Sequence, residues 1–143
     1  MASEVPWELR VTLRAGSVYY FAHRGLDSPE PHYFIVVNSE PLVDGMLVLV
    51  VASSKVAAVK QRRRTLPETT LVEVAPSDYQ EFSVPSIVDC NRVFALSLAE
   101  LAERWTRRVV FAKTDLPGEI LTQLQSAVKL SPLVETELKR LIY

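Results

Sequence analysis

Two apolar runs that lie close together in the sequence constrain the fold more than any other feature. The first is HYFIVVN at residues 32–38, and the second is MLVLVVA at residues 46–52. Both runs are rich in β-branched and aromatic residues and are too short for independent helices, which predicts two strands. The linker between them contains Pro41 and the pair Asp44-Gly45, a combination typical of the connection in a β-hairpin.

Each run is apolar at successive positions rather than at alternate ones, so both faces of each strand are expected to be covered. A small barrel, or a sheet packed under helices, covers strands in this way. The ends of the runs are polar, with His32 before the first strand and Ser53, Ser54 and Lys55 after the second. Because binding and catalytic side chains often follow rigid strands, these strand ends are the first candidates for a functional site.

The segments around these runs suggest further strands and two loops. Apolar residues alternate over residues 5–13, which predicts an edge strand or an extended arm with one buried face. Residues 17–22 have the composition of a strand, and residues 23–31 contain a glycine and two prolines that predict a loop. Residues 55–64 (KVAAVKQRRR) carry only a narrow apolar stripe, and we interpret them as a long basic loop.

The C-terminal half is predicted to begin with strands. Residues 69–74 form one strand, and residues 86–96 form another with a bulge near Cys90. Ser97 with Glu100 three residues later matches a capping box and predicts a short helix.

The chain is then predicted to end in helices. Residues 107–113 are interpreted as a connection or an edge strand, and residues 117–143 as two helices. The second helix is expected to start with Ser131 as its cap and Pro132 in its first turn. Strands first and helices later indicate an α+β domain or a small barrel with helical additions.

Length and composition favour one domain over residues 1–143, with an N-terminal arm at residues 1–15. The single cysteine excludes an internal disulfide and favours a reducing compartment. No apolar segment approaches the ~20 residues of a membrane helix, and the N-terminus lacks the apolar run of a signal peptide. We therefore expect a soluble cytoplasmic protein that contacts no membrane.

The sequence offers no pattern for a metal or a cofactor. The two histidines and the cysteine lack the spacing of metal ligands, and there is no glycine-rich phosphate loop. We expect no metal site and no nucleotide cofactor.

The order of these segments resembles that of the MazF/PemK-type toxins over roughly residues 16–130. The matching features are Gly16 before a first strand, a strand rising to Val36-Val37-Asn38, the hydroxyl pair Ser53-Ser54 after the second long strand, a basic segment, the strand Thr70-Leu71-Val72-Glu73-Val74, Ser86-Ile87-Val88 with Asn91 beyond it, and a late Leu116-Pro117 before a helix. The resemblance implies a mainly β, SH3-like small barrel with C-terminal helices. It also implies a homodimer, a cognate antitoxin partner, and cleavage of single-stranded RNA without a metal, leaving a cyclic phosphate.

The resemblance also implies site residues. In that family a threonine after the second long strand and an arginine just before the preceding strand lead catalysis, and the matching positions here are Ser53 and His32. A serine keeps the hydroxyl donor, whereas a histidine exchanges a proton but lacks the two-pronged donor of arginine. The candidate RNA-binding residues are Ser54, Lys55, Arg62, Arg63, Arg64 and Arg92, of which the basic segment would attract the strand electrostatically.

Two further positions depart from the family pattern. Asn91 stands where an aspartate is common and is unable to act as a base, and Phe94 replaces an expected cation unless Arg92 takes its role. An alternative is therefore a non-catalytic relative that binds nucleic acid or a protein partner. A third hypothesis is an interaction protein whose C-terminal helices supply an apolar surface.

Overall fold

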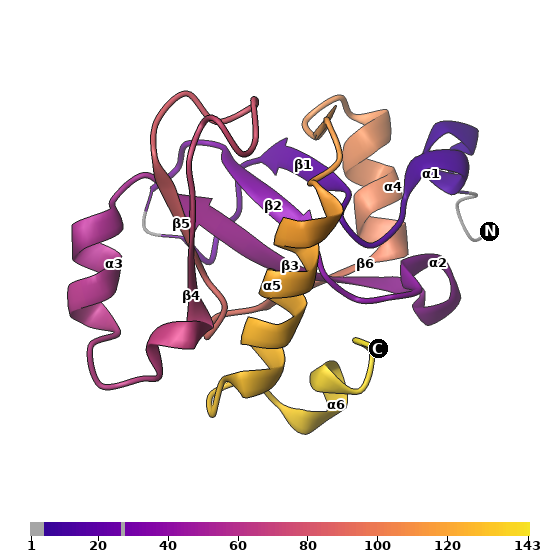
Figure 1. Ribbon diagram of the computed structural model, residues 1–143. Helices are drawn as coiled ribbons and strands as arrows, with labels where there is room; N and C mark the ends of the chain where they lie inside the picture. Colours follow the sequence, from indigo (N-terminus) through magenta and orange to yellow (C-terminus); the bar gives the residue numbers. More distant parts are fainter. Residues whose placement is uncertain (1–4, 27) are drawn as a thin grey trace.

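The computed structural model describes residues 5–26 and 28–143, and its centre is a seven-stranded antiparallel sheet (Figure 1). The strand order is β4-β5-β3-β2-β1-β7, with β6 beside β3. The strands are β1 (Val18–Phe21), β2 (His32–Val36), β3 (Met46–Ser53), β4 (Leu71–Val74), β5 (Ser86–Asp89), β6 (Phe94–Ser97) and β7 (Phe111–Lys113). The two strands predicted from the apolar runs are confirmed as β2 and β3, which pair antiparallel.

Strand β3 is shared between two parts of the sheet. Strand β2 lies along one of its edges, while β6 pairs with the first half of the other edge and β5 with the second half. Within the described residues β4 and β7 each pair with a single strand, so the sheet stays open rather than closing into a barrel. A strand that changes partners along its length bends the sheet, as in small barrels. The predicted architecture of strands with C-terminal helices is confirmed in this open form.

Six α-helices and a 3-10 turn accompany the described strands. The helices are α1 (Trp7–Thr12), α2 (Pro41–Asp44), α3 (Val56–Arg62), α4 (Leu98–Thr106), α5 (Gly118–Leu130) and α6 (Thr136–Lys139), and the 3-10 turn is η1 (Glu68–Thr70). Helix α2 lies in the linker between β2 and β3, and Gly45 ends it with a φ of 68°, a left-handed conformation that glycine adopts without strain. The predicted hairpin connection therefore contains a helical turn.

Both faces of the central strands are buried, as predicted. Phe34 and Val36 of β2 belong to one apolar cluster, which includes residues of α1 and α4. Ile35 and Val37 point to the opposite cluster, which includes residues of α5. Figure 1 shows α5 crossing one face of the sheet, with α1 and α4 grouped away from it. Alternate residues of one strand thus enter two different cores.

The predicted N-terminal strand or extended arm is wrong, because residues 7–12 form helix α1. Of the alternating apolar residues, Leu9 and Leu13, which are four positions apart, are buried, whereas Trp7 and Val11 are exposed. Residues four positions apart lie on the same face of a helix, so burial of this pair is compatible with a helix that packs by one face. Residues 1–4 of the predicted arm lie outside the described residues.

The predicted basic loop at residues 55–64 is also wrong, because most of it forms helix α3. Val59 is almost fully buried and anchors the helix to the protein. Its last turn carries Lys60 and Arg62, and cations are favourable at a helix C-terminus. A narrow apolar stripe is sufficient here because the helix is short and makes further contacts through its charged side chains.

The second half follows the predictions with two corrections. The capping box of Ser97 and Glu100 is present at the start of α4, and the expected edge strand is β7. The predicted strand over residues 86–96 is instead two strands, β5 and β6, joined by a turn. Ser131 does not cap the last helix, which starts only after Glu135.

The loop predicted over residues 23–31 is confirmed at its described positions, whereas Asp27 lies outside the described residues. In the described part of the chain, none of the helices combines the length and apolar character required to cross a membrane.

Candidate functional site

A pocket of about 280 Å³ lies where the outer ends of β2 and β3 meet helix α3, and we call it the strand-end pocket. Several predicted site residues line it together, namely His32, Ser53, Ser54, Lys55, Arg62 and Arg92. The remaining lining residues include Leu26, Ser28, Glu30, Val59 and Asp89. The structure therefore brings residues from four separate parts of the sequence to one concave surface.

The pairing of β2 with β3 explains why His32 and Ser53 meet. The pairing ends with Phe34 opposite Val51, so His32 and Ser53, each two residues further along its strand, lie at the same end of the two strands. Both side chains line the strand-end pocket. A histidine and a serine that are distant in the sequence thus become neighbours at the rim of the pocket.

The hydrogen bonds of His32 define which of its ring nitrogens can accept a proton. Nδ1 lies 2.8 Å from the carbonyl oxygen of Glu30. A carbonyl oxygen only accepts hydrogen bonds, so Nδ1 carries a proton and donates it. In the neutral ring Nε2 is then the basic nitrogen, which is the arrangement that a general base requires.

Ser53 keeps its own proton available. Its Oγ accepts a hydrogen bond of 3.1 Å from the backbone N–H of Lys55, at the start of helix α3. The hydroxyl group is therefore oriented by the backbone while its O–H remains a donor. A donor of this kind suits an anionic oxygen in the pocket.

Three cations line the pocket. Lys55 and Arg62 come from the two ends of the α3 region, and Arg92 comes from the turn between β5 and β6. Arg92 is held in place by its hydrogen bond to the carbonyl oxygen of Gly25 and by the ring of Phe94, whose centroid is 4.9 Å from its Cζ. The two acidic residues of the lining are Glu30 and Asp89.

Arg63 and Arg64 do not line this pocket. They line a separate hollow of about 410 Å³ together with Lys60 and Glu73. Helix α3 ends at Arg62, and Arg63 and Arg64 belong to the turn that follows it. The basic run is therefore divided between two hollows, although Arg62 and Arg63 both lie against Asp89.

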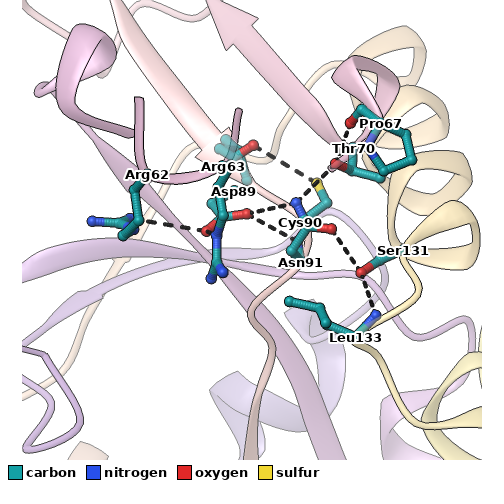
Figure 2. A network of polar contacts seen from close by, with 10 residues as sticks. Arg62, Arg63, Pro67, Thr70, Asp89, Cys90, Asn91, Ser131 and Leu133 are labelled. Atoms are coloured by element: carbon teal, nitrogen blue, oxygen red, sulfur yellow. Dashed lines mark hydrogen bonds and ion pairs between the residues drawn. The ribbon is translucent and has the colours of Figure 1, made fainter. Parts of the chain in front are cut away.

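Glu30 and Asp89 are the charged residues of the site that sequence reasoning missed, and Figure 2 shows how Asp89 is held. One carboxylate oxygen accepts a hydrogen bond of 2.7 Å from Nε of Arg63 and lies 3.9 Å from the guanidinium group of Arg62. The other oxygen accepts hydrogen bonds from the backbone N–H and the side-chain amide of Asn91, at 3.0 and 3.1 Å. Its place as the last residue of a buried strand was the available signal, the same one that pointed to Ser53.

Asn91 lies inside the protein rather than in the pocket (Figure 2). Its amide nitrogen also donates to Oγ1 of Thr70 at 2.8 Å, and its amide oxygen accepts from Oγ of Ser131 at 2.7 Å. The network joins β5, η1 and the end of α5 behind the pocket wall. Asn91 is thus a structural residue, and Ser131 is the partner that it binds.

The lone cysteine belongs to the same buried region. Cys90 is fully buried, and burial raises the pKa of its thiol group. A protonated, buried thiol is a packing residue rather than a nucleophile. Over residues 5–26 and 28–143, no group of three or more His, Cys, Asp or Glu side chains is arranged to hold a metal ion.

Comparisons with known proteins bear on the fold. No protein-family model matches the sequence, and a search of curated proteins finds no match. Among solved structures, a chain from the crystal structure of MazE–MazF from Deinococcus radiodurans matches with a TM-score of 0.50 and 13% sequence identity. The match covers 88% of this chain and 93% of that chain. The chain therefore has a MazF-like fold, and the fold expected from the resemblance is confirmed.

Proposed function

We propose that this protein is the toxin of a type II toxin–antitoxin system, and that it cuts single-stranded RNA in the cytoplasm without a metal ion. The observation that supports this most is the strand-end pocket, where His32 and Ser53 meet among three cations in a MazF-like fold. A basic nitrogen, a hydroxyl donor and positive charge around one hollow suit a phosphodiester.

In the proposed reaction the ribose 2′-oxygen attacks the adjacent phosphorus. His32 Nε2 accepts the 2′-hydroxyl proton as the O2′–P bond forms, and the P–O5′ bond breaks. Lys55 donates a proton to the departing 5′-oxygen. Ser53 and the arginines Arg62 and Arg92 hold the charge that develops on the phosphoryl oxygens. The products are a 2′,3′-cyclic phosphate and a 5′-hydroxyl group.

The proposal includes an antitoxin partner and a homodimer. The similar solved structure is named for MazE together with MazF. Leu130 and Leu133, at the junction of the C-terminal helices, are 57% and 53% exposed, and such side chains favour an interface. Contacts with the antitoxin or with a second copy of the chain would cover this apolar surface. It is the same surface that the third hypothesis from the sequence proposed for an interaction protein.

The test is a cleavage assay on labelled single-stranded RNA in the presence of a metal chelator. Wild-type protein should yield fragments with cyclic phosphate ends, and Ser53→Ala should slow cleavage roughly 100-fold because one donor to the phosphoryl oxygens is lost. Thr122→Ala, an exposed hydroxyl residue of α5 outside the pocket, is the matched control. Equal rates for Ser53→Ala and wild type would contradict the catalytic assignment.

A non-catalytic, nucleic-acid-binding protein is the second candidate. The observation that favours it is that both oxygens of Asp89 are already held by Arg63 and Asn91, so this carboxylate is not available as a base. Salt-sensitive binding of RNA without any cleavage would support this candidate over the first.

A further inference from the structure

Asp89 is the last residue of strand β5, and it lies where several segments of the strand-end pocket meet. Strand β5 pairs with β3 at this point, with Ile87 opposite Ser53. The side chain of Asp89 lines the pocket, yet it is only 8% exposed. Most of the carboxylate group is therefore covered by neighbouring residues, and its contacts with them decide what it does.

Asp89 shapes the turn that carries Arg92. Its backbone carbonyl oxygen accepts a hydrogen bond of 3.4 Å from the backbone N–H of Arg92. Its carboxylate oxygen Oδ1 accepts one of 3.0 Å from the backbone N–H of Asn91. An aspartate that binds the backbone two residues further on forms an Asx turn, which restricts the path of the chain. The direction in which Arg92 leaves strand β5 therefore depends on Asp89.

The same carboxylate holds the end of helix α3 (Figure 2). Its Oδ2 accepts a hydrogen bond of 2.7 Å from Nε of Arg63 and lies 3.9 Å from the guanidinium group of Arg62. Arg63 directly follows Arg62, the last residue of the helix. A charge-assisted hydrogen bond of this length is strong and directional. One side chain thus links the two segments that bring arginines to the strand-end pocket.

The charge of Asp89 acts in opposite directions on binding and on reaction. A carboxylate in the lining repels a phosphodiester and so weakens its binding. A fixed arrangement of arginines, in contrast, gives its largest benefit in the transition state, where charge develops on the phosphoryl oxygens. Because Arg63 and Asn91 already occupy the two carboxylate oxygens, Asp89 takes no proton from the substrate.

We propose that Asp89 is a positioning residue for RNA cleavage. By fixing the end of α3 and the turn after β5, it directs Arg62 and Arg92 toward the phosphoryl oxygens. This inference rests on the proposed function, since it requires a phosphodiester in the strand-end pocket. Asp89 raises the rate of the chemical step and lowers the affinity for the strand.

The test compares turnover with binding in Asp89→Asn, which removes the charge and keeps the size of the side chain. Cleavage of labelled RNA in the presence of a chelator gives kcat, which should fall roughly 30-fold because the arginines are misplaced. Fluorescence anisotropy with single-stranded DNA, whose sugars lack the attacking 2′-hydroxyl, gives the Kd. The Kd should stay the same or fall by about two- to threefold, since the repulsion is lost.

Arg63→Ala tests the same connection from the side of α3. Arg63 does not line the strand-end pocket, so a loss of kcat in this variant reports its hold on Asp89. We expect kcat to fall roughly tenfold, and the double variant should lose no more than Asp89→Asn alone. Glu73→Gln is the matched control, because Glu73 forms an exposed ion pair of 3.0 Å with Lys60 of the same helix, away from the pocket. Its kcat should equal that of wild type.

Thermal melting shows whether each variant is folded at the assay temperature, and Arg63→Ala decides the question if Asp89→Asn is not. An unchanged kcat in either folded variant would overturn the role of Asp89 and leave the proposed function standing. A parallel loss of kcat and of DNA affinity in Asp89→Asn would also overturn it, since a merely structural residue gives that result. Absence of cleavage by wild-type protein would overturn the proposed function itself, and the inference with it.

Discussion

Buried polar side chains in this protein are paired with one another. Asn38 donates to Asp44 and to the carbonyl oxygen of Met46, at 2.9 and 2.8 Å, and accepts from the backbone N–H of Val48. Asn91 is similarly enclosed by its partners. In the described part of the chain, every buried side-chain nitrogen or oxygen has a hydrogen-bond partner. These amides therefore hold the fold together, whereas the polar side chains predicted to act in the pocket are half-exposed or exposed.

Asn91→Ala is expected to lower the free energy of unfolding by about 2–3 kcal/mol, because it leaves polar atoms of Thr70 and Ser131 buried without their partner. Urea denaturation measures the loss. Gln123→Ala, on the exposed face of α5, is the control and should change stability by about 0.5 kcal/mol or less. A loss for Asn91→Ala no larger than that of the control would show that the network contributes little.

His23 predicts a dependence of stability on pH. Its pKa is lowered in the folded protein, so folding favours the neutral ring. Its stabilising contribution is complete above the pKa of about 6.5 of the unfolded state and decreases as pH falls from there through the lower folded pKa. The melting temperature of wild type should therefore fall more between pH 7.5 and pH 5 than that of His23→Gln. Parallel melting curves for the two proteins would argue against this role.

Among the elements, the ends of the short helices determine where charged side chains lie. Helix α3 ends at Arg62, which lines the strand-end pocket, and the turn after it places Arg63 and Arg64 along the other hollow. Helix α4 ends at Thr106, and Arg108, just after its cap residue Arg107, is left-handed with a φ of 60°. The backbone N–H groups of Arg108 and Val109 donate to the carbonyl oxygens of Trp105 and Arg104, which closes the helix.

Arg62→Ala and Arg64→Ala provide a matched comparison of two arginines in one basic run. Arg62 lines the strand-end pocket, so its loss should weaken RNA binding and reduce the slope of log K against log salt by about 0.7. Arg64 lines the other hollow and should leave the slope nearly unchanged. Binding titrations at several salt concentrations measure both slopes. Equal changes for the two variants would indicate that the basic run acts as a single patch.

Arg108→Gly is expected to raise the free energy of unfolding by about 1 kcal/mol, because glycine adopts the left-handed conformation without the clash of a Cβ atom. Thermal melting measures the gain. Arg107→Gly is the control, since Arg107 has a right-handed helical conformation and should lose stability on the same change. A lower melting temperature for Arg108→Gly would mean that the arginine side chain makes a compensating contribution.

At the scale of the whole molecule, the two cores and the shared strand β3 locate the pocket. Strand β3 contributes residues to both clusters and ends at Ser53, which pairs with Ile87 of β5. Helix α1 helps to cover one of these faces through Leu9, which is fully buried. The polar strand ends remain at the edge of a rigid, doubly covered sheet.

Leu9→Ala should lower the free energy of unfolding by about 2–4 kcal/mol, because it removes a buried leucine from the cluster around Phe34. Val11→Ala, two residues further on and 54% exposed, should cost less than about 0.5 kcal/mol. Urea denaturation of both variants distinguishes a helix packed by one face from an extended arm. Similar losses at the two positions would favour the arm.

The sequence was sufficient to predict strands β1 to β4, the capping box of α4 and the double coverage of the central strands, because residue type and periodicity are local properties. It predicted β5 and β6 as one strand. It also identified His32, Ser53 and Arg92 as candidate site residues. The sequence pattern did not distinguish a helix from alternation at residues 7–12, nor a helix from a loop at residues 56–62. Only the tertiary structure decided these, since burial of Leu9 and Val59 against distant strands selects the helical conformation. It also decided that Arg63 and Arg64 leave the pocket and that Asp89 joins it, because contacts between distant segments fix where each side chain points.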